Sequence, residues 1–245
     1  MSKYRTGSKR HKVPQWRKQI AYDAEFQAFL EKFLTSDRME VMKQTLDNRT
    51  RHLTIAIEDI YHPHNASAVV RTCDAFGIQD LHIIENRNKY RMNPKVALGS
   101  GQWIDIIKHN EAEHNSAACV RHLKEKGYKV IATTPHTEDI SLYDLKVDDS
   151  VALIFGNEKD GISDEVRNEV DGFMRIPMYG FAESFNISVS AAICLSVLTE
   201  KLRKTDIQWQ LSEEEKKIIL FEWTKHKVGT IDKYLHEFKR LQNEA

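Results

Sequence analysis

The alternation of apolar and polar residues divides the middle of the chain into short strands and intervening helices. Six short runs rich in β-branched and apolar residues are typical of strands buried in a sheet. These runs are residues 53–60, 80–85, 104–107, 129–133, 151–155 and 173–178. Several are separated by stretches in which apolar residues recur at helical spacing, namely 66–76, 117–126 and 164–170. Strands that alternate with helices predict an α/β fold with a mostly parallel sheet, because each parallel pair needs a crossover connection.

The first strand, helix and strand of this series form a βαβ unit, which implies a parallel pair with a right-handed crossover. The first strand ends at a proline turn, and Asn65 is placed to cap the helix 66–76. Ligands of such sheets bind at the carboxyl ends of the strands. We therefore expect the loops after Ile60, Phe155 and Met178 to meet in one site.

The segment 173–198 has the most informative order of residues. Its apolar run includes Pro177, which cannot donate a hydrogen bond to a neighbouring strand, so the strand is expected to end there. A polar loop that contains Ser184 and Asn186 follows, and from Ile187 the residues are small or apolar almost without interruption. A buried helix entered through such a loop presents free backbone N–H groups, which commonly bind an anion or a cofactor.

Both ends of the chain predict helices outside this α/β pattern. Residues 24–46 are rich in helix formers and predict two short helices. Near the other end, Ser212 and Glu215 form a capping box, and a last helix is expected from Thr230. The expected organisation is a basic tail with a helical extension at 1–50, a central domain at 51–205 and a helical extension at 206–245.

Charge is balanced over the whole chain but not along it. The 245 residues include 36 Lys and Arg and 36 Asp and Glu, so net charge gives no argument for a nucleic-acid or membrane partner. Residues 1–18 hold seven Lys and Arg and no acidic residue, a pattern that suits contact with phosphates and equally suits a solvated tail. No signal peptide and no apolar run long enough to span a membrane are found, so a cytoplasmic protein is expected.

The cysteine and histidine patterns predict no metal site. Cys73, Cys119 and Cys194 are widely spaced, which favours buried reduced thiols over a disulfide or zinc ligands. His62 and His64 flank a proline without a matching carboxylate or cysteine pair, so turn residues are expected there. The sequence also lacks a Walker loop, a GxGxxG motif and a GxSxG motif. Phosphoryl transfer, dinucleotide binding and α/β-hydrolase chemistry thereby lose their main support.

What remains is a set of polar residues in and beside the loops at the strand ends. They are Asn65, Arg71, Asn157, Glu158, Ser184 and Asn186. Each one alone has an ordinary explanation, since Asn65 and Ser184 could cap helices while Arg71 and Glu158 could face water. Their occurrence together around three loops favours a single functional site.

Three segments that contain these residues resemble the motifs of a known family. The segments are NASAVVRTCDAFG (65–77), FGNEKDGIS (155–163) and IPMYGFAESFNISVSAA (176–192). In this order and at this separation they closely resemble the three motifs of the SpoU branch of the SPOUT RNA methyltransferases, and the resemblance covers roughly residues 53–202. The upstream RMEVMKQTLDNRTRHLTI and the short helical ends are most similar to the TrmH-type group, which methylates the ribose of guanosine-18 in the D-loop of tRNA.

The resemblance implies a fold, a cofactor and an assembly. It implies a deep trefoil knot formed by the loop near Gly180 and the helix after Asn186, with S-adenosyl-L-methionine bound in the knot and a homodimer as the working form. The implied cofactor-binding residues are Thr133, Gly156, Ile176 and Phe185. The implied catalytic residue is Arg71, which the family assigns to activating the 2′-hydroxyl. The residues implied to hold arginine, cofactor and ribose in place are Asn65, Glu158, Ser184 and Asn186.

Two roles are open for Arg71. A guanidinium is protonated at physiological pH, so a role as base needs a strong perturbation, whereas its paired donors suit a clamp on the phosphate beside the target ribose. For RNA contact we expect the tail 1–18, the loop 89–95 and a third basic cluster. That cluster consists of Lys201, Arg203 and Lys204.

Three other functions stay open at this point. The motifs do not encode the RNA target, so a ribosomal-RNA 2′-O-methyltransferase of the same family is the main alternative. The chain could also be an RNA-binding module that has kept the fold and lost the reaction, against which the presence of Asn65, Arg71, Glu158, Ser184 and Asn186 argues. A nucleotide-binding α/β protein unrelated to RNA is the third alternative.

Overall fold

The computed structural model describes residues 20–135 and 138–244, which fall into two compact units. One unit spans residues 45–211, and the other combines residues 20–44 with residues 212–244. The predicted phosphate-contacting tail, residues 1–18, lies outside the described residues.

The larger unit is built on a sheet of seven strands whose neighbours all pair in parallel. The strands are β1 (Leu53–Glu58), β2 (Asp80–Ile84), β3 (Asp105–His109), β4 (Lys129–Thr133), β5 (Ile140–Ser141), β6 (Val151–Phe155) and β7 (Gly172–Arg175). Their order across the sheet is β3-β2-β1-β6-β4-β7-β5. The expected α/β fold with a mostly parallel sheet is confirmed, and the trefoil knot stays a prediction.

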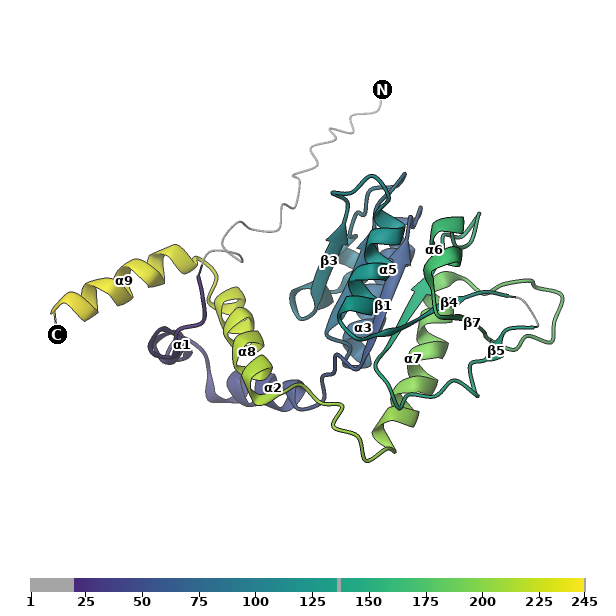
Figure 1. The fold of residues 1–245 in the computed structure, drawn as a ribbon. Coiled ribbons are helices and arrows are strands. Elements are labelled where there is room, and N and C mark those ends of the chain that lie inside the picture. The colour runs from purple at the N-terminus through teal and green to yellow at the C-terminus, as the bar shows by residue number, and fades with distance from the viewer. Residues whose placement is uncertain (1–19, 136–137, 245) are drawn as a thin grey trace, which may run out of the picture. The chain divides into compact units, whose positions relative to one another are not determined.

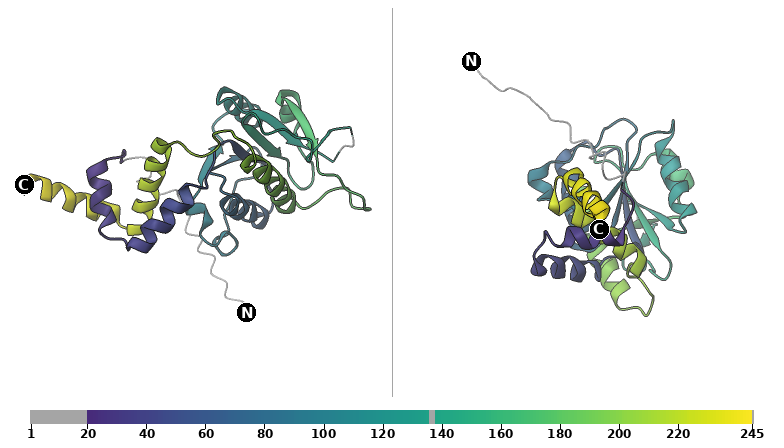
Figure 2. Two further views of the ribbon diagram at one scale, coloured as in Figure 1. Left: turned by 90° about the horizontal axis from the view of Figure 1, so that it is seen from below. Right: turned by 90° about the vertical axis from the view of Figure 1, so that its left-hand side faces the viewer.

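Helices cover both faces of this sheet (Figures 1 and 2). The principal ones are α3 (Pro63–Ala75), α5 (Asn115–Glu125), α6 (Asp164–Glu169) and α7 (Ile187–Arg203). Side chains alternate along β1, so Leu53, Ile55 and Ile57 pack with α3 and α7 in one core layer. Ala56 points the other way and packs with Cys119 of α5 in the second layer. The apolar residues of the strands therefore fill two layers, one on each side of the sheet.

Polar side chains cap the starts of several helices, and the expected capping box at Ser212 is among them. Ser163 caps α6, Asn186 caps α7 by accepting a hydrogen bond from the backbone N–H of Ser188, and Ser212 heads a complete capping box. The expectation that Asn65 caps a helix 66–76 is wrong. The helix begins earlier, because Pro63 suits the first helical position, where no N–H is needed.

The segment between β2 and β3 is partly helical. It contains a one-turn helix α4 (Pro94–Ala97) and a 3₁₀ turn η2 (Ser100–Gln102), neither of which the sequence analysis expected. Asn93 caps α4 by accepting a hydrogen bond from the backbone N–H of Lys95.

The smaller unit is helical. Its elements include α1 (Ala24–Glu31), most of α2 (Ser36–Leu46), α8 (Glu213–Val228) and α9 (Ile231–Glu244). Its core is largely aromatic, with Phe26 and Phe29 of α1 packed against Phe221 of α8 and Phe238 of α9. The two short amino-terminal helices and the two carboxyl-terminal helices were all expected. Among the described residues, no helix is both long and apolar enough to cross a membrane.

Candidate active site

The candidate site lies where the strand order of the sheet reverses. β1 is flanked by β2 on one side and by β6 on the other, and the helices that follow β1 and β6 pack on opposite faces of the sheet. The carboxyl ends of two such strands border a crevice in open α/β sheets, because their loops diverge to the two faces. The loop 59–62 after β1 and the loop 156–163 after β6 therefore frame the site.

The loop 156–163 is a tight hairpin. Asn157 and Gly161 exchange backbone hydrogen bonds of 3.0 and 3.1 Å, and the Asn157 side chain accepts from the backbone N–H groups of Lys159 and Asp160. A Cβ atom on Gly156 would stand 2.0 Å from the carbonyl carbon of Gly161, so only glycine fits at this close approach. The hairpin holds Glu158 near its tip.

Glu158 is joined to two of the other predicted residues by a chain of hydrogen bonds. The Asn65 amide donates to Glu158 Oε1 at 2.6 Å, and the Asn186 amide donates to Asn65 Oδ1 at 3.1 Å. The backbone N–H of Tyr61 donates to the second carboxylate oxygen of Glu158 at 3.3 Å. Residues from three separate motifs are thus linked in one chain of hydrogen bonds. Because Asn65 lies in the first turn of α3, its side chain is free to make these bonds.

Hydrogen bonds keep this carboxylate ionised. Burial alone would raise the pKa of Glu158, but the Asn65 amide and nearby backbone N–H groups, which donate to the charged form, outweigh that effect and lower the pKa below its ordinary value. Glu158 is therefore an anion at neutral pH, with its oxygens already directed at two donors.

The buried carboxylate of Glu58, which was not predicted from the sequence, anchors the end of the hairpin by hydrogen bonds. Glu58, the last residue of β1, accepts hydrogen bonds from the backbone N–H of Ser163 at 2.9 Å and from its hydroxyl at 2.6 Å. The hydroxyl of Ser116 in α5 donates to the same carboxylate. Glu58 therefore ties the ends of β1 and of the hairpin to α5. The signal that could have revealed it is an acidic residue at the end of an otherwise apolar strand.

The neighbouring Asp59 was missed as well, and it anchors the segment after β2. It adopts a positive φ of 49° and accepts from the backbone N–H groups of Asn86 and Arg87 at 2.8 and 2.9 Å. The Arg87 guanidinium contacts both Asp59, at 3.4 Å, and Asp160 of the hairpin, at 3.2 Å. The loops that follow β1, β2 and β6 are thereby linked to one another.

Two predicted catalytic residues lie outside the hydrogen-bonded chain. Arg71 is six positions after Asn65 in α3, about 120° around the helix axis, and its side chain is exposed. Ser184 is exposed in the loop before α7. Within the described residues, neither side chain has a hydrogen bond or ion pair to Asn65, Glu158 or Asn186.

Three of the four predicted cofactor-binding residues lie at the carboxyl ends of neighbouring strands. Thr133 ends β4, Gly156 follows β6 and Ile176 follows β7, and these three strands are adjacent in the order β6-β4-β7. Phe185 stands in the loop before α7 with 41% of its surface exposed. Ile176 is half-buried and Phe185 is exposed, so each offers apolar surface of the kind that packs against an adenine ring such as that of S-adenosylmethionine.

The predicted RNA-contacting residues differ in whether their charged groups are already bonded within the chain. Lys89 and Arg91 line a small cavity next to Tyr61 at the carboxyl ends of β1 and β2. In contrast, the Lys201 ammonium group donates to the backbone carbonyls of Tyr143 and Leu145 at 2.5 and 3.1 Å. The Arg203 guanidinium stacks on Trp209 at 4.7 Å, and Lys204 pairs with Glu200 at 2.8 Å. The expectation of RNA contact is thus better supported at 89–91 than at 201–204.

Comparison with known proteins gives consistent matches. A match to the SpoU rRNA Methylase family covers residues 52–196. The tRNA (guanosine(18)-2′-O)-methyltransferase of Borreliella burgdorferi is 41% identical over 187 residues, which are 76% of this chain and 84% of that protein. The protein of the same description from Thermus thermophilus is 32% identical and covers 66% of this chain and 81% of its own length.

The fold is also similar to that of a solved structure. The crystal structure of the A. aeolicus TrmH/SpoU tRNA modifying enzyme superposes with a TM-score of 0.71 at 30% identity. The match covers 81% of this chain and 98% of that one, so it extends beyond the segment matched by the family.

Proposed function

This chain belongs to the SpoU rRNA Methylase family, and on that premise we propose that it is a tRNA (guanosine-18-2′-O)-methyltransferase that uses S-adenosylmethionine. The observation that carries the proposal is the meeting of Asn65, Glu158 and Asn186, one from each motif, at the end of β1 and β6. Relatives described as tRNA (guanosine(18)-2′-O)-methyltransferases align over most of their length with this chain, which supports tRNA as the substrate.

Methyl transfer requires that the ribose 2′-hydroxyl be aligned with the methyl group and lose its proton. When bound, S-adenosylmethionine supplies an electrophilic methyl group on a sulfonium, which passes to the ribose oxygen as the hydroxyl proton is released and S-adenosylhomocysteine remains. Asn65 is fixed between Glu158 and Asn186, so the polar groups around the proposed ribose site are held in place before the substrate binds. The ionised Glu158 orients Asn65 and can attract cationic or hydroxyl donors of the complex.

Arg71 is proposed to act at the site of a second copy of the chain. Within one chain its exposed guanidinium lies on a different side of α3 from Asn65, which leaves it available to a partner. A homodimer in which the motifs meet at the interface would give each site an arginine from the opposite subunit. Its paired donors suit a clamp on the phosphate next to the target ribose, since that role needs no change of pKa.

The remaining parts of the chain have proposed roles in RNA binding. We assign residues 51–205 to a methyltransferase domain and the flanking 1–50 and 206–245 to extensions, in a cytoplasmic protein. The tail 1–18 and the cavity-lining Lys89 and Arg91 would contact tRNA phosphates.

The test is methyl transfer to defined RNAs. The purified full chain is incubated with labelled S-adenosylmethionine and an unmodified tRNA transcript, a matched transcript that already carries 2′-O-methylguanosine at position 18, or ribosomal RNA. Incorporation into the first RNA alone, mapped to nucleotide 18, is the expected result. Incorporation into ribosomal RNA alone would support the second function that the family description suggests. Cofactor binding without transfer to either RNA would indicate a non-catalytic RNA-binding member.

A further inference from the structure

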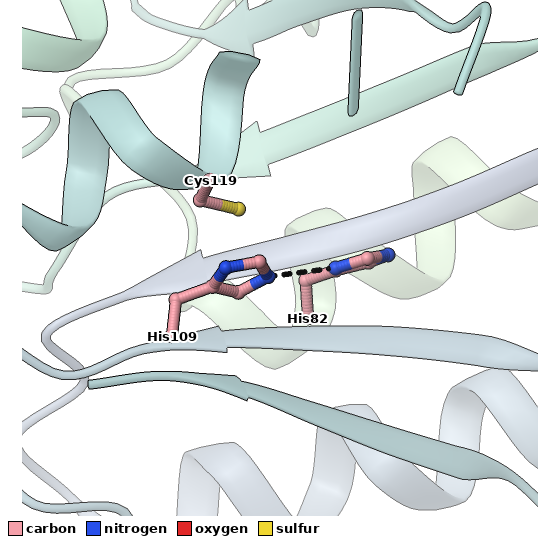
Figure 3. Close-up of side chains that lie close together, drawn as sticks. All are labelled: His82, His109 and Cys119. Atoms are coloured by element: carbon pink, nitrogen blue, oxygen red, sulfur yellow. Dashed lines mark hydrogen bonds between the residues drawn. The ribbon is translucent and has the colours of Figure 1, made fainter. Parts of the chain in front are cut away.

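Three side chains that are able to bind a metal lie close together on the face of the sheet opposite α3 and α7. His82 lies in β2, His109 ends β3 and Cys119 lies in α5. The register pairs His82 with Ile107 and Ile84 with His109, so the two histidines are two positions apart on neighbouring strands and share a face. Figure 3 shows that Cys119 projects from α5 toward this pair.

The distances among their possible ligand atoms are short. One nitrogen of each ring and the sulfur of Cys119 all lie within 4.8 Å of one another, and His82 Nδ1 is 3.0 Å from His109 Nε2. A tetrahedral zinc ion with bonds of about 2.0 Å to nitrogen would hold two such nitrogens about 3.3 Å apart. Closing around an ion would therefore move the two rings by a few tenths of an ångström.

The surroundings of the cluster are apolar. Cys119 is fully buried and packs with Val120, Leu123 and Ile84, and the His82 side chain is 2% exposed. The hydrogen bond between the two rings satisfies one nitrogen of each, and the sulfur of Cys119 lies beside that pair.

A third imidazole stands beside the cluster. His122 is one turn after Cys119 in α5, and its ring centroid is 5.6 Å from that of His109 and 6.0 Å from that of His82. Side chains three positions apart lie on the same side of a helix. His122 therefore borders the cluster, although it is not among the residues whose ligand atoms lie within 4.8 Å of one another.

We propose that His82, His109 and Cys119 bind one divalent transition-metal ion, with zinc as the preferred ion. Two imidazoles and a thiolate form a ligand set that favours zinc or cobalt over magnesium or calcium. Binding requires loss of the Cys119 proton, which a dipositive ion beside the sulfur promotes. Such an ion would fasten α5 to β2 and β3 and would take no part in methyl transfer.

The test uses the full-length protein stripped of metal with a chelator. Zinc or cobalt(II) is added, metal per chain is measured by elemental analysis, and cobalt spectra are recorded for tetrahedral d–d bands and a thiolate-to-cobalt charge-transfer band. We expect one ion per chain, a charge-transfer band and a higher melting temperature with the ion. No stoichiometric binding by the wild-type chain would overturn the proposal.

Two variants and two matched controls locate the ion. Cys119→Ala and His109→Gln are expected to lower affinity for cobalt at least tenfold, and Cys119→Ala to abolish the charge-transfer band. Cys194→Ala removes another buried thiol and His114→Gln an exposed histidine beside α5, and both should bind as wild type. Circular dichroism checks folding of each variant. His109 is only partly buried, so His109→Gln decides the question if Cys119→Ala does not fold. Retention of wild-type affinity by a folded His109→Gln chain would overturn the assignment.

Discussion

Among the glycines that the structure describes, Gly156 leaves the least room for a side chain, because an added Cβ would meet the carbonyl carbon of Gly161 at the base of the hairpin that carries Glu158. We expect Gly156→Ala to destabilise the protein by about 1–3 kcal/mol, since a methyl group there must push backbone apart. Urea unfolding measures this loss. Gly180→Ala is the matched control, because nothing lies within 4 Å of a Cβ at that position. Equal stability of the two variants would contradict the steric argument.

The Asn65 amide is expected to set the ionisation of Glu158. Removing its donor in Asn65→Ala should raise the pKa of Glu158, because burial then acts against the charged form with less compensation. Because the pKa rises, Glu158 in the variant would gain a proton at a higher pH than in the wild-type chain. Carboxyl carbon chemical shifts followed by NMR against pH report the value. His64→Ala, a change at the exposed neighbour, should leave it unaltered.

Arg71 is expected to act in turnover and not in cofactor binding. Arg71→Lys and Arg71→Ala should both lose most of the methyl transfer, since lysine keeps the charge but lacks the planar pair of donors. Binding of S-adenosylmethionine, measured by calorimetry, should stay near the wild-type value. Wild-type turnover in Arg71→Ala would remove this residue from the mechanism.

Residues that lie in short motifs can be singled out from the sequence, whereas residues that act through contacts between distant elements cannot. Asn65, Glu158 and Asn186 were found because each lies next to a strand end or helix start, and the structure joins them. Glu58 was missed because its partners, Ser116 and Ser163, lie 58 and 105 positions away. The cluster of His82, His109 and Cys119 has no local spacing at all, since each comes from a different element.

At the scale of elements, the spacing of apolar residues was sufficient to locate most strands and helices. Each element must turn apolar side chains toward one of the two core layers, so the spacing of those residues follows the geometry of the strand or helix. The exceptions are short elements. β5 has two residues and α4 has four, too few for a period to be recognised. The start of α3 was misplaced because Pro63, a turn former in one context, is also favoured at the first position of a helix.

The capping box of α8 gives a prediction at this scale. The Ser212 hydroxyl accepts from the backbone N–H of Glu215, and the Glu215 carboxylate accepts from the backbone N–H of Ser212 at 2.9 Å. Ser212→Ala removes half of this exchange and should lower stability by about 1 kcal/mol in urea unfolding. Ser36→Ala is the control, because that hydroxyl donates to the exposed Asp37 at 3.5 Å, which is a weak contact. A loss in the control as large as in Ser212→Ala would show that the cap contributes nothing of its own.

On the scale of the whole molecule, balanced charge has a consequence for RNA binding. With 36 basic and 36 acidic residues there is no net attraction for a polyanion, so affinity must come from places where basic residues gather. Several basic side chains of the larger unit are already committed, as Lys201 is to backbone carbonyls and Arg87 is to Asp59 and Asp160. In the sequence, the stretch with the most Lys and Arg and no acidic residue is the tail 1–18, which has seven.

Deleting residues 1–18 is therefore expected to weaken binding to tRNA and to flatten its dependence on salt. Each phosphate contact made by a Lys or Arg releases condensed counterions, so losing contacts reduces the slope of log K against log salt concentration. Fluorescence anisotropy at several salt concentrations measures both quantities. A chain with the same eighteen residues in scrambled order keeps the charge and should keep the slope if the tail acts as a diffuse cation. If the deleted chain shows the wild-type slope, the tail makes no phosphate contact, and the attraction must come from the loop that holds Lys89 and Arg91.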